Sequence, residues 1–143
     1  MAIYENEDNP KTGAEMYELA YEYIESLNGK PLNEELGGQW LIKAAENDCV
    51  EAMRNLGTFY FGDKYGKSIY GIPVDHKQGV YWLTKILVVG EDDGVRANAM
   101  TNLAICYLKG EGVPVNIENA RQFCKDAAAL GDSMAQDILS RYL

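Results

Sequence analysis

A recurring pattern of small and aromatic residues constrains the fold of this chain most strongly. Leu103-Ala104-x-x-Tyr107 is matched upstream by Leu56-Gly57-x-x-Tyr60 and by Leu19-Ala20-x-x-Tyr23. A large aromatic residue follows each motif, and these three are Trp40, Trp82 and Phe123. A helical hairpin of this length cannot bury its own apolar face, so successive hairpins stack on one another. The repeats therefore predict an all-α solenoid of about three and a half helix-turn-helix units with seven helices.

The boundaries of the units follow from helix-capping residues and turns. The first helix is expected to begin either at Asn9-Pro10 or at a capping box that starts with Thr12. Polar N-cap candidates precede the later helices, and they are Asn33, Asp75, Asn116 and Asp132. The second unit is longer than the others because two of its loops carry insertions, which a solenoid tolerates. We expect a flexible tail at residues 1–9 and a single repeat domain at 10–143. Its units are expected at about 13–49, 50–96 and 97–133, with a partial unit at 134–143.

The third unit carries the pattern most completely. Its matching residues are Ala99, Leu103, Ala104, Tyr107, Gly110, Gly112, Val113, Asn116, Ala120, Phe123, Ala127, Ala128 and Gly131. This pattern resembles the Sel-one-like repeat family, whose members are related to tetratricopeptide repeats. The resemblance implies a right-handed α-α superhelix whose first helices line a concave surface, and it implies a scaffold or adaptor role.

Each recurring residue type has an expected structural role. The aromatic anchors are expected to fill the seams between helices, and they are Trp40, Trp82, Phe123, Tyr23, Tyr60 and Tyr107. Gly57 and Ala104 should let paired helices approach closely. Gly110 and Gly112 should allow the backbone to reverse within a few residues.

The negative charge of the chain is concentrated near its start. The net charge is −9. Residues 1–51 hold 12 acidic and 3 basic residues, a difference of −9, whereas residues 52–143 hold 10 of each. This distribution argues against nucleic acid or an anionic membrane as a ligand and favours a basic protein surface.

Four glutamates form the first candidate binding surface. Glu15, Glu18, Glu22 and Glu25 fall within about one quarter of the circumference of the first helix, at roughly 100° per residue. None of them has a Lys or Arg three or four residues later, which is the usual means of neutralising such a face. One interpretation is a solvated face of the first repeat. The other is an acidic groove for a basic partner.

The segment 61–74 is the second candidate binding surface, because it is the largest departure from the repeat. Tyr65 and Tyr70 lie near Lys64 and Lys67 in this segment, a combination that suits a protein interface. Alternatively, the tyrosines fold back on the neighbouring repeat.

No residues form a recognisable catalytic, metal or cofactor motif. Glu91-Asp92-Asp93 is explained by helix capping better than by a cation, and His76 is the only histidine. Cys49, Cys106 and Cys124 lack CxxC spacing, and Cys106 and Cys124 are expected to be inert core thiols. The N-terminus lacks the basic flank and apolar core of a secretory signal. We expect a cytoplasmic protein without cofactor or metal.

The sequence therefore favours a non-enzymatic protein-interaction module. The most specific hypothesis is an inhibitor or immunity-type protein that neutralises a basic toxin or effector through the acidic first repeat and the concave face. The alternative is a general adaptor or scaffold in signalling or protein quality control. A hydrolase with carboxylate chemistry is a remote alternative. We expect a monomer or weak dimer that binds neither nucleic acid nor membrane.

Overall fold

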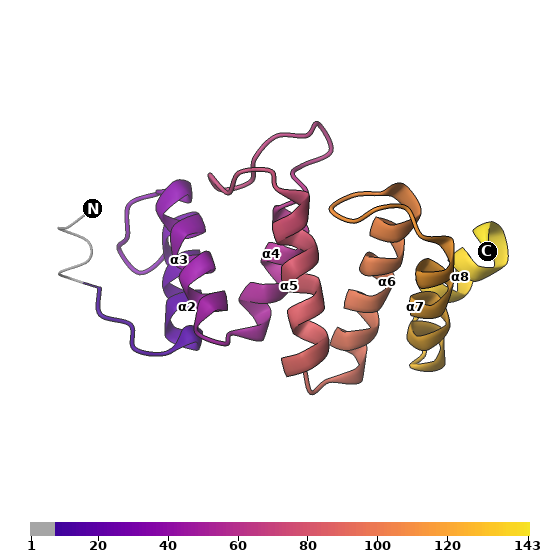
Figure 1. The fold of residues 1–143 in the computed structure, drawn as a ribbon. Coiled ribbons are helices and arrows are strands. Elements are labelled where there is room, and N and C mark those ends of the chain that lie inside the picture. Colours follow the sequence, from indigo (N-terminus) through magenta and orange to yellow (C-terminus); the bar gives the residue numbers. More distant parts are fainter. Residues whose placement is uncertain (1–7) are drawn as a thin grey trace.

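The computed structural model describes residues 8–143, and seven helices and no strand occur in this part of the chain. The helices are α2 (Gly13–Ile24), α3 (Glu34–Glu46), α4 (Val50–Phe59), α5 (His76–Val89), α6 (Asp93–Lys109), α7 (Ile117–Ala129) and α8 (Ser133–Tyr142). Three hairpins, α2–α3, α4–α5 and α6–α7, stand side by side in chain order, and α8 follows them (Figure 1). The predicted all-α repeat solenoid is confirmed.

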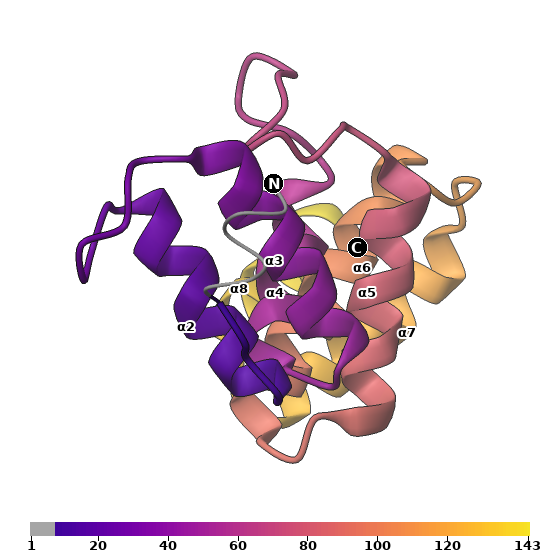
Figure 2. The same ribbon diagram turned by 90° about the vertical axis from the view of Figure 1, so that its left-hand side faces the viewer.

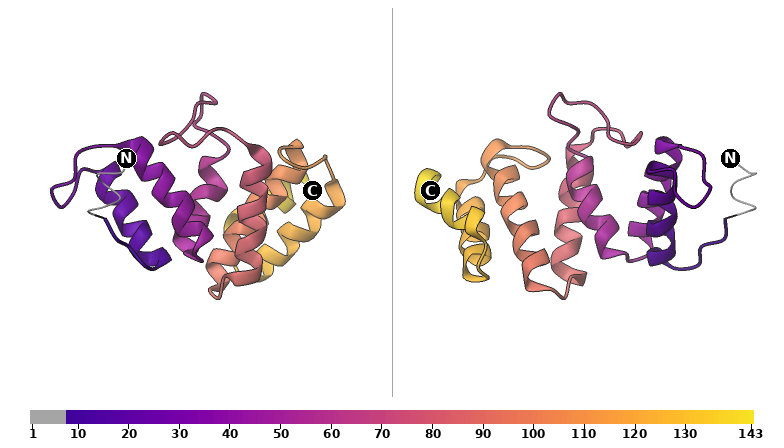
Figure 3. Two further views of the ribbon diagram at one scale, coloured as in Figure 1. Left: turned by 60° about the vertical axis from the view of Figure 1, so that its left-hand side comes forward. Right: turned by 180° about the vertical axis from the view of Figure 1, so that it is seen from behind.

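The hairpins stack so that equivalent helices form two layers. The second helices α3, α5 and α7 form one layer, and the first helices α2 and α4 lie behind α3 and α5 in Figure 1. Figure 2 looks along the stack, with the α2–α3 hairpin nearest the viewer and the later hairpins behind it. The connection between α4 and α5 projects from one edge of the stack, as the views in Figure 3 show.

Polar side chains begin the helices where the sequence predicted them. Thr12, Asn33, Asp75, Asn116 and Asp132 each accept a hydrogen bond from the backbone N–H three residues later. These bonds satisfy N–H groups that have no partner inside the helix. The positions of the five caps are therefore confirmed.

The aromatic anchors differ in how deeply their side chains are buried. Trp40 is 8% exposed, Trp82 is 6% exposed and Tyr23 is fully buried. Phe123 is only half-buried and its ring stacks on that of Tyr107 at 5.9 Å between centroids. Phe123 contacts both hydrophobic clusters, the large one over α2–α6 and the smaller one over α6–α8. The core is therefore continuous along the stack but thinner toward α8.

Two glycines hold positions that a larger residue would disturb. A Cβ at Gly57 would lie 2.8 Å from Leu83 Cδ2, so α4 and α5 approach closely there. Gly112 has φ +77°, and a Cβ there would lie 2.4 Å from the carbonyl oxygen of His76. The turn after α6 is thus pressed against the first residue of α5, which a side chain would prevent.

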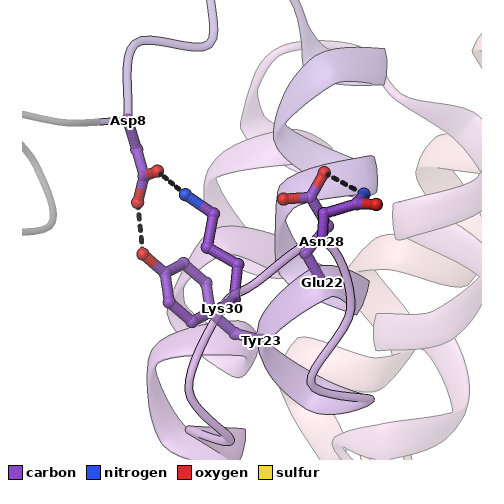
Figure 4. A network of polar contacts seen from close by, with 5 residues as sticks. All are labelled: Asp8, Glu22, Tyr23, Asn28 and Lys30. Carbon is purple, nitrogen blue, oxygen red and sulfur yellow. Dashed lines mark hydrogen bonds and ion pairs between the residues drawn. The ribbon is translucent and has the colours of Figure 1, made fainter.

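The segment before α2 is fixed to the first hairpin. Residues 1–7 of the expected flexible tail lie outside the described residues. Asp8, which was expected in the same tail, is instead 8% exposed: its carboxylate accepts a hydrogen bond from the Tyr23 hydroxyl and pairs with the Lys30 ammonium (Figure 4). A buried carboxylate needs such partners, and both become available only when α2 and the α2–α3 turn pack together. Asp8 therefore belongs to the folded first repeat.

Candidate protein-binding surface

The structure brings the four predicted glutamates together along α2. Glu15, Glu18 and Glu22 line an open hollow between α2 and the segment that carries Asp8. Glu18, Glu22 and Glu25 line a second hollow that adjoins the first. Because the two hollows share Glu18 and Glu22, the carboxylates form one acidic strip, which we call the α2 acidic strip (Glu15, Glu18, Glu22 and Glu25).

The α2 acidic strip has no ion-pair partner within the described chain, although Lys30, which pairs with Asp8, lines the same hollow as Glu15, Glu18 and Glu22. Glu15 accepts a hydrogen bond from the Thr12 hydroxyl and Glu22 accepts one from the Asn28 amide, each at 3.1 Å. Among residues 8–143, none of the four carboxylates lies within 4.0 Å of a cationic side chain. Like charges three and four residues apart on a helix destabilise it slightly. A cationic partner would relieve this repulsion.

A pair of tyrosines beside the acidic strip was missed in the sequence. The Tyr17 and Tyr21 rings lie 5.1 Å apart, and the Asn55 amide of α4 donates a 2.7 Å hydrogen bond to the Tyr21 hydroxyl. Burial above all, together with the neighbouring Tyr17 and Tyr70, raises the pKa of Tyr21 to about 12. The spacing Tyr17-x-x-x-Tyr21 places both rings on one helix face and was the available signal. These rings link the first and second repeats.

In the 61–74 segment, Tyr65 matches the interpretation of an exposed contact surface, whereas Tyr70 matches the alternative of a tyrosine that folds back on the repeat. Tyr65 is 74% exposed, with the Lys64 ammonium 5.2 Å from its ring centroid. Tyr70 folds back instead: its ring meets that of Phe59 edge-on at 5.5 Å. The Tyr70 carbonyl also lies so close to Gly38 that a Cβ there would be 2.0 Å from its oxygen. Tyr70 thus anchors the segment, whereas Tyr65 is presented to solvent.

Lys67 contributes mainly through its backbone. Its N–H donates to the Asp63 carboxylate at 2.9 Å, and its carbonyl accepts from the Asp63 N–H at 2.8 Å. The Lys64 and Lys67 side chains are both exposed. The tip of the segment is therefore a hydrogen-bonded turn that displays Tyr65 with the Lys64 ammonium against its ring.

The cysteines, the histidine and the acidic residues before α6 are accounted for by burial, ring packing and helix capping. Burial raises the pKa of the Cys106 thiol to about 11 and also raises the pKa of the Cys49 and Cys124 thiols. His76 stacks on Phe61 with ring centroids 5.2 Å apart. Asp92 caps α6 by accepting from the Val95 N–H at 2.9 Å. Within residues 8–143, no cluster of three or more His, Cys, Asp or Glu is placed to hold a metal ion.

Three helical hairpins that stack in chain order define this chain as a helical repeat protein. The Sel1 repeat matches residues 16–49, 50–86 and 97–132, so the chain belongs to the Sel1 repeat family, and the predicted resemblance is confirmed. Proteins of this family are protein-interaction modules. In the part of the chain that the structure describes, no helix is both long and apolar enough to cross a membrane.

Solved structures of other repeat proteins share this fold. A Sel1 repeat protein from Oxalobacter formigenes is 25% identical, with a TM-score of 0.71 over 91% of this chain and 89% of that one. A protective antigen of uropathogenic Escherichia coli with an SLR fold is 25% identical, with a TM-score of 0.67 over 86% of this chain and 24% of that one. Cysteine-rich protein B of Helicobacter pylori is 20% identical, with a TM-score of 0.58 over 92% of this chain and all of that one. Among curated proteins, none matches this chain.

Proposed function

We propose that this chain is a non-enzymatic, cytoplasmic module that captures a basic protein. The contact surface is the α2 acidic strip together with the face formed by the first helices α2, α4 and α6. The observation that carries the proposal is the set of carboxylates that line open hollows with no ion-pair partner among the described residues. Lys30 also lines the first hollow, but its ammonium pairs with Asp8. Because the entire net charge of −9 arises from residues 1–51, the surrounding field adds to the attraction of these carboxylates.

The most specific form of the proposal is an inhibitor or immunity-type protein that neutralises a basic toxin or effector. Electrostatic complementarity speeds the encounter of two proteins and orients them, which suits rapid one-to-one neutralisation. A general adaptor is the second candidate, and the observation that favours it is the separate display of Tyr65 and Lys64 on the 61–74 segment. An inhibitor predicts one tight partner, whereas an adaptor predicts several weaker ones.

The test is affinity capture from the native lysate by the full chain, followed by mass spectrometry. Charge reversal by Glu18→Lys together with Glu22→Lys is compared with the matched control Glu118→Lys with Asp126→Lys on α7, which changes the net charge equally. We expect one basic protein to be captured in a salt-sensitive manner, lost with the α2 pair and retained with the α7 pair. Equal capture by both charge-reversed variants would contradict the assigned surface.

Stability must be measured in parallel, because a misfolded variant would also lose its partner. Glu18 is exposed and Glu22 is half-buried, and neither is in an ion pair among residues 8–143. We therefore expect each reversal to change the free energy of unfolding by about 0.5 kcal/mol or less, as is usual for surface substitutions. Several captured proteins of moderate affinity would favour the adaptor over the inhibitor.

A further inference from the structure

A hollow of about 280 Å³ lies between the end of α3 and α5, which are neighbours in the layer of second helices (Figure 1). We call it the α3–α5 hollow. Glu46, the last residue of α3, and Asp48, in the turn that follows, line one side of it. The other side is formed by α5, through Gln78, Tyr81, Trp82 and Lys85. No residue of the α2 acidic strip lines this hollow, so it is a separate candidate site.

Trp82 brings an unused hydrogen-bond donor to the α3–α5 hollow. Its side chain is 6% exposed, and its Nε1 is buried without a hydrogen-bond partner among residues 8–143. A buried donor without a partner lowers the stability of the fold. Phe123 holds the equivalent position in the third repeat, so a ring without an N–H can fill such a seam. A ligand that accepts the Trp82 hydrogen bond therefore explains the indole better than packing does.

Opposite charges line the two sides of the α3–α5 hollow without meeting. Lys85 is half-buried on α5, whereas Glu46 and Asp48 are exposed on the other side. In the part of the chain from residue 8 onward, the Lys85 ammonium has no carboxylate within 4.0 Å. Hydrogen bonds between charged groups are stronger than those between neutral ones. The hollow therefore suits a ligand that carries both an ammonium and a carboxylate.

We propose that the α3–α5 hollow binds a small zwitterion of the free α-amino acid class. The ligand carboxylate accepts a hydrogen bond from Trp82 Nε1 and pairs with Lys85, while the ligand ammonium pairs with the carboxylates opposite. Tyr81 is 51% exposed, and its ring meets that of Trp82 edge-on at 4.9 Å, so it offers a wall for the ligand side chain. Ligand pockets usually enclose about 300–1,000 Å³, so this smaller hollow suits a ligand the size of an amino acid.

The probes are the common L-amino acids, each titrated at millimolar concentration into the full chain labelled with ¹⁵N. Trp40 and Trp82 give the two indole N–H resonances of the chain, and Trp82→Phe identifies the one that belongs to Trp82. We expect at least one amino acid to shift this resonance downfield in a saturable manner, because its proton enters a hydrogen bond. The N-acetyl derivative and the methyl ester of that amino acid each lack one charge, so each should bind about tenfold more weakly or worse.

Isothermal titration calorimetry with the same amino acid tests the lining residues. Lys85→Gln, Trp82→Phe, and the double variant Glu46→Gln with Asp48→Asn should each weaken binding by about tenfold or more. Asn tolerates the positive φ of Asp48, 66°, so the double variant keeps the turn after α3. Lys77→Gln changes an exposed lysine of α5 outside the hollow, so this matched control should leave binding unchanged.

Each outcome decides for or against the zwitterion site. Binding that needs both ligand charges, and that is weakened in lining variants shown by circular dichroism to be folded, supports it. Equal binding of either blocked derivative overturns it, as does binding that is unchanged in the folded lining variants. A Trp82 resonance that responds to no amino acid also overturns it. None of these measurements involves the α2 acidic strip, so this proposal and the proposed function can fail separately.

Discussion

Trp82→Ala tests the stacking of the hairpins, because Trp82 of α5 is a buried member of the large hydrophobic cluster that extends over α2–α6. The side chain is 6% exposed, and an aromatic side chain buries about 150–250 Å². At about 25 cal/mol per Å² this corresponds to about 4–6 kcal/mol. Compactness of the unfolded chain lowers the value by about 10–40%. We therefore expect Trp82→Ala to reduce the free energy of unfolding by about 3–5 kcal/mol, the range observed for large-to-small core substitutions.

A second variant, Trp82→Phe, separates the contribution of the ring from that of the indole N–H. Trp82 Nε1 is buried and has no hydrogen-bond partner among residues 8–143. Trp82→Phe keeps most of the ring packing and removes an unsatisfied donor, so we expect it to cost less than about 2 kcal/mol. The assay is equilibrium unfolding in urea followed by far-ultraviolet circular dichroism. Val88→Ala on the same helix is the control, since Val88 is 80% exposed and should change stability by only about 0.5 kcal/mol.

Two results would refute the reasoning about Trp82. A loss below about 1 kcal/mol for Trp82→Ala would mean that the seam between hairpins contributes little to stability. A loss for Trp82→Phe as large as that for Trp82→Ala would mean that the indole N–H, rather than the apolar ring, provides the stabilisation.

Three further predictions concern the loop anchor, a tyrosine and the thiols. Gly38→Ala should destabilise the fold and expose the 61–74 segment to limited proteolysis, because the added carbon would lie 2.0 Å from the Tyr70 carbonyl oxygen. Gly94→Ala should have a much smaller effect, because the added carbon would meet only the Asp92 carboxylate, at 3.1 Å. Tyr21 has a pKa of about 12 in the folded chain against an ordinary value of 10.0, so its protonated form contributes stability below pH 10 that is lost as the pH rises through 12. Tyr21→Phe should flatten the decline in unfolding free energy over this range, and an unchanged decline would contradict the assignment. Because burial raises the pKa of all three thiols, that of Cys106 to about 11, Ellman's reagent at pH 8 should label Cys49, Cys106 and Cys124 only after denaturation, and rapid labelling of the native chain would contradict their burial.

Local chemistry was the part of the fold that could be predicted well. Asn33 and Asp75 cap their helices as expected because a capping bond spans only three residues. The recurrence of Trp40 and Trp82 predicted buried seams, and both side chains are buried. Repeats make tertiary contacts predictable because each hairpin meets mainly its neighbours.

The candidate surface could be predicted only in part. The four glutamates were found because a helix places residues three and four apart on one face. The sequence could not decide between the two interpretations of the 61–74 segment, because Tyr65 and Tyr70 have the same chemistry. Tyr70 packs on Phe59 and Gly38 of neighbouring helices, whereas Tyr65 is 74% exposed with Lys64 against its ring.

The sequence by itself determined that this chain forms stacked helical hairpins with an acidic beginning. Periodicity, capping and charge are properties of nearby residues, so they can be identified without coordinates. Only the tertiary structure decided that Asp8 is buried against Tyr23 and Lys30, and that Tyr21 reaches Asn55 in the next repeat. These contacts join residues 15 to 34 positions apart. The Asp8 contacts depend on how the segment before α2 packs on the first hairpin, and the Tyr21–Asn55 contact depends on how the first hairpin packs on the second.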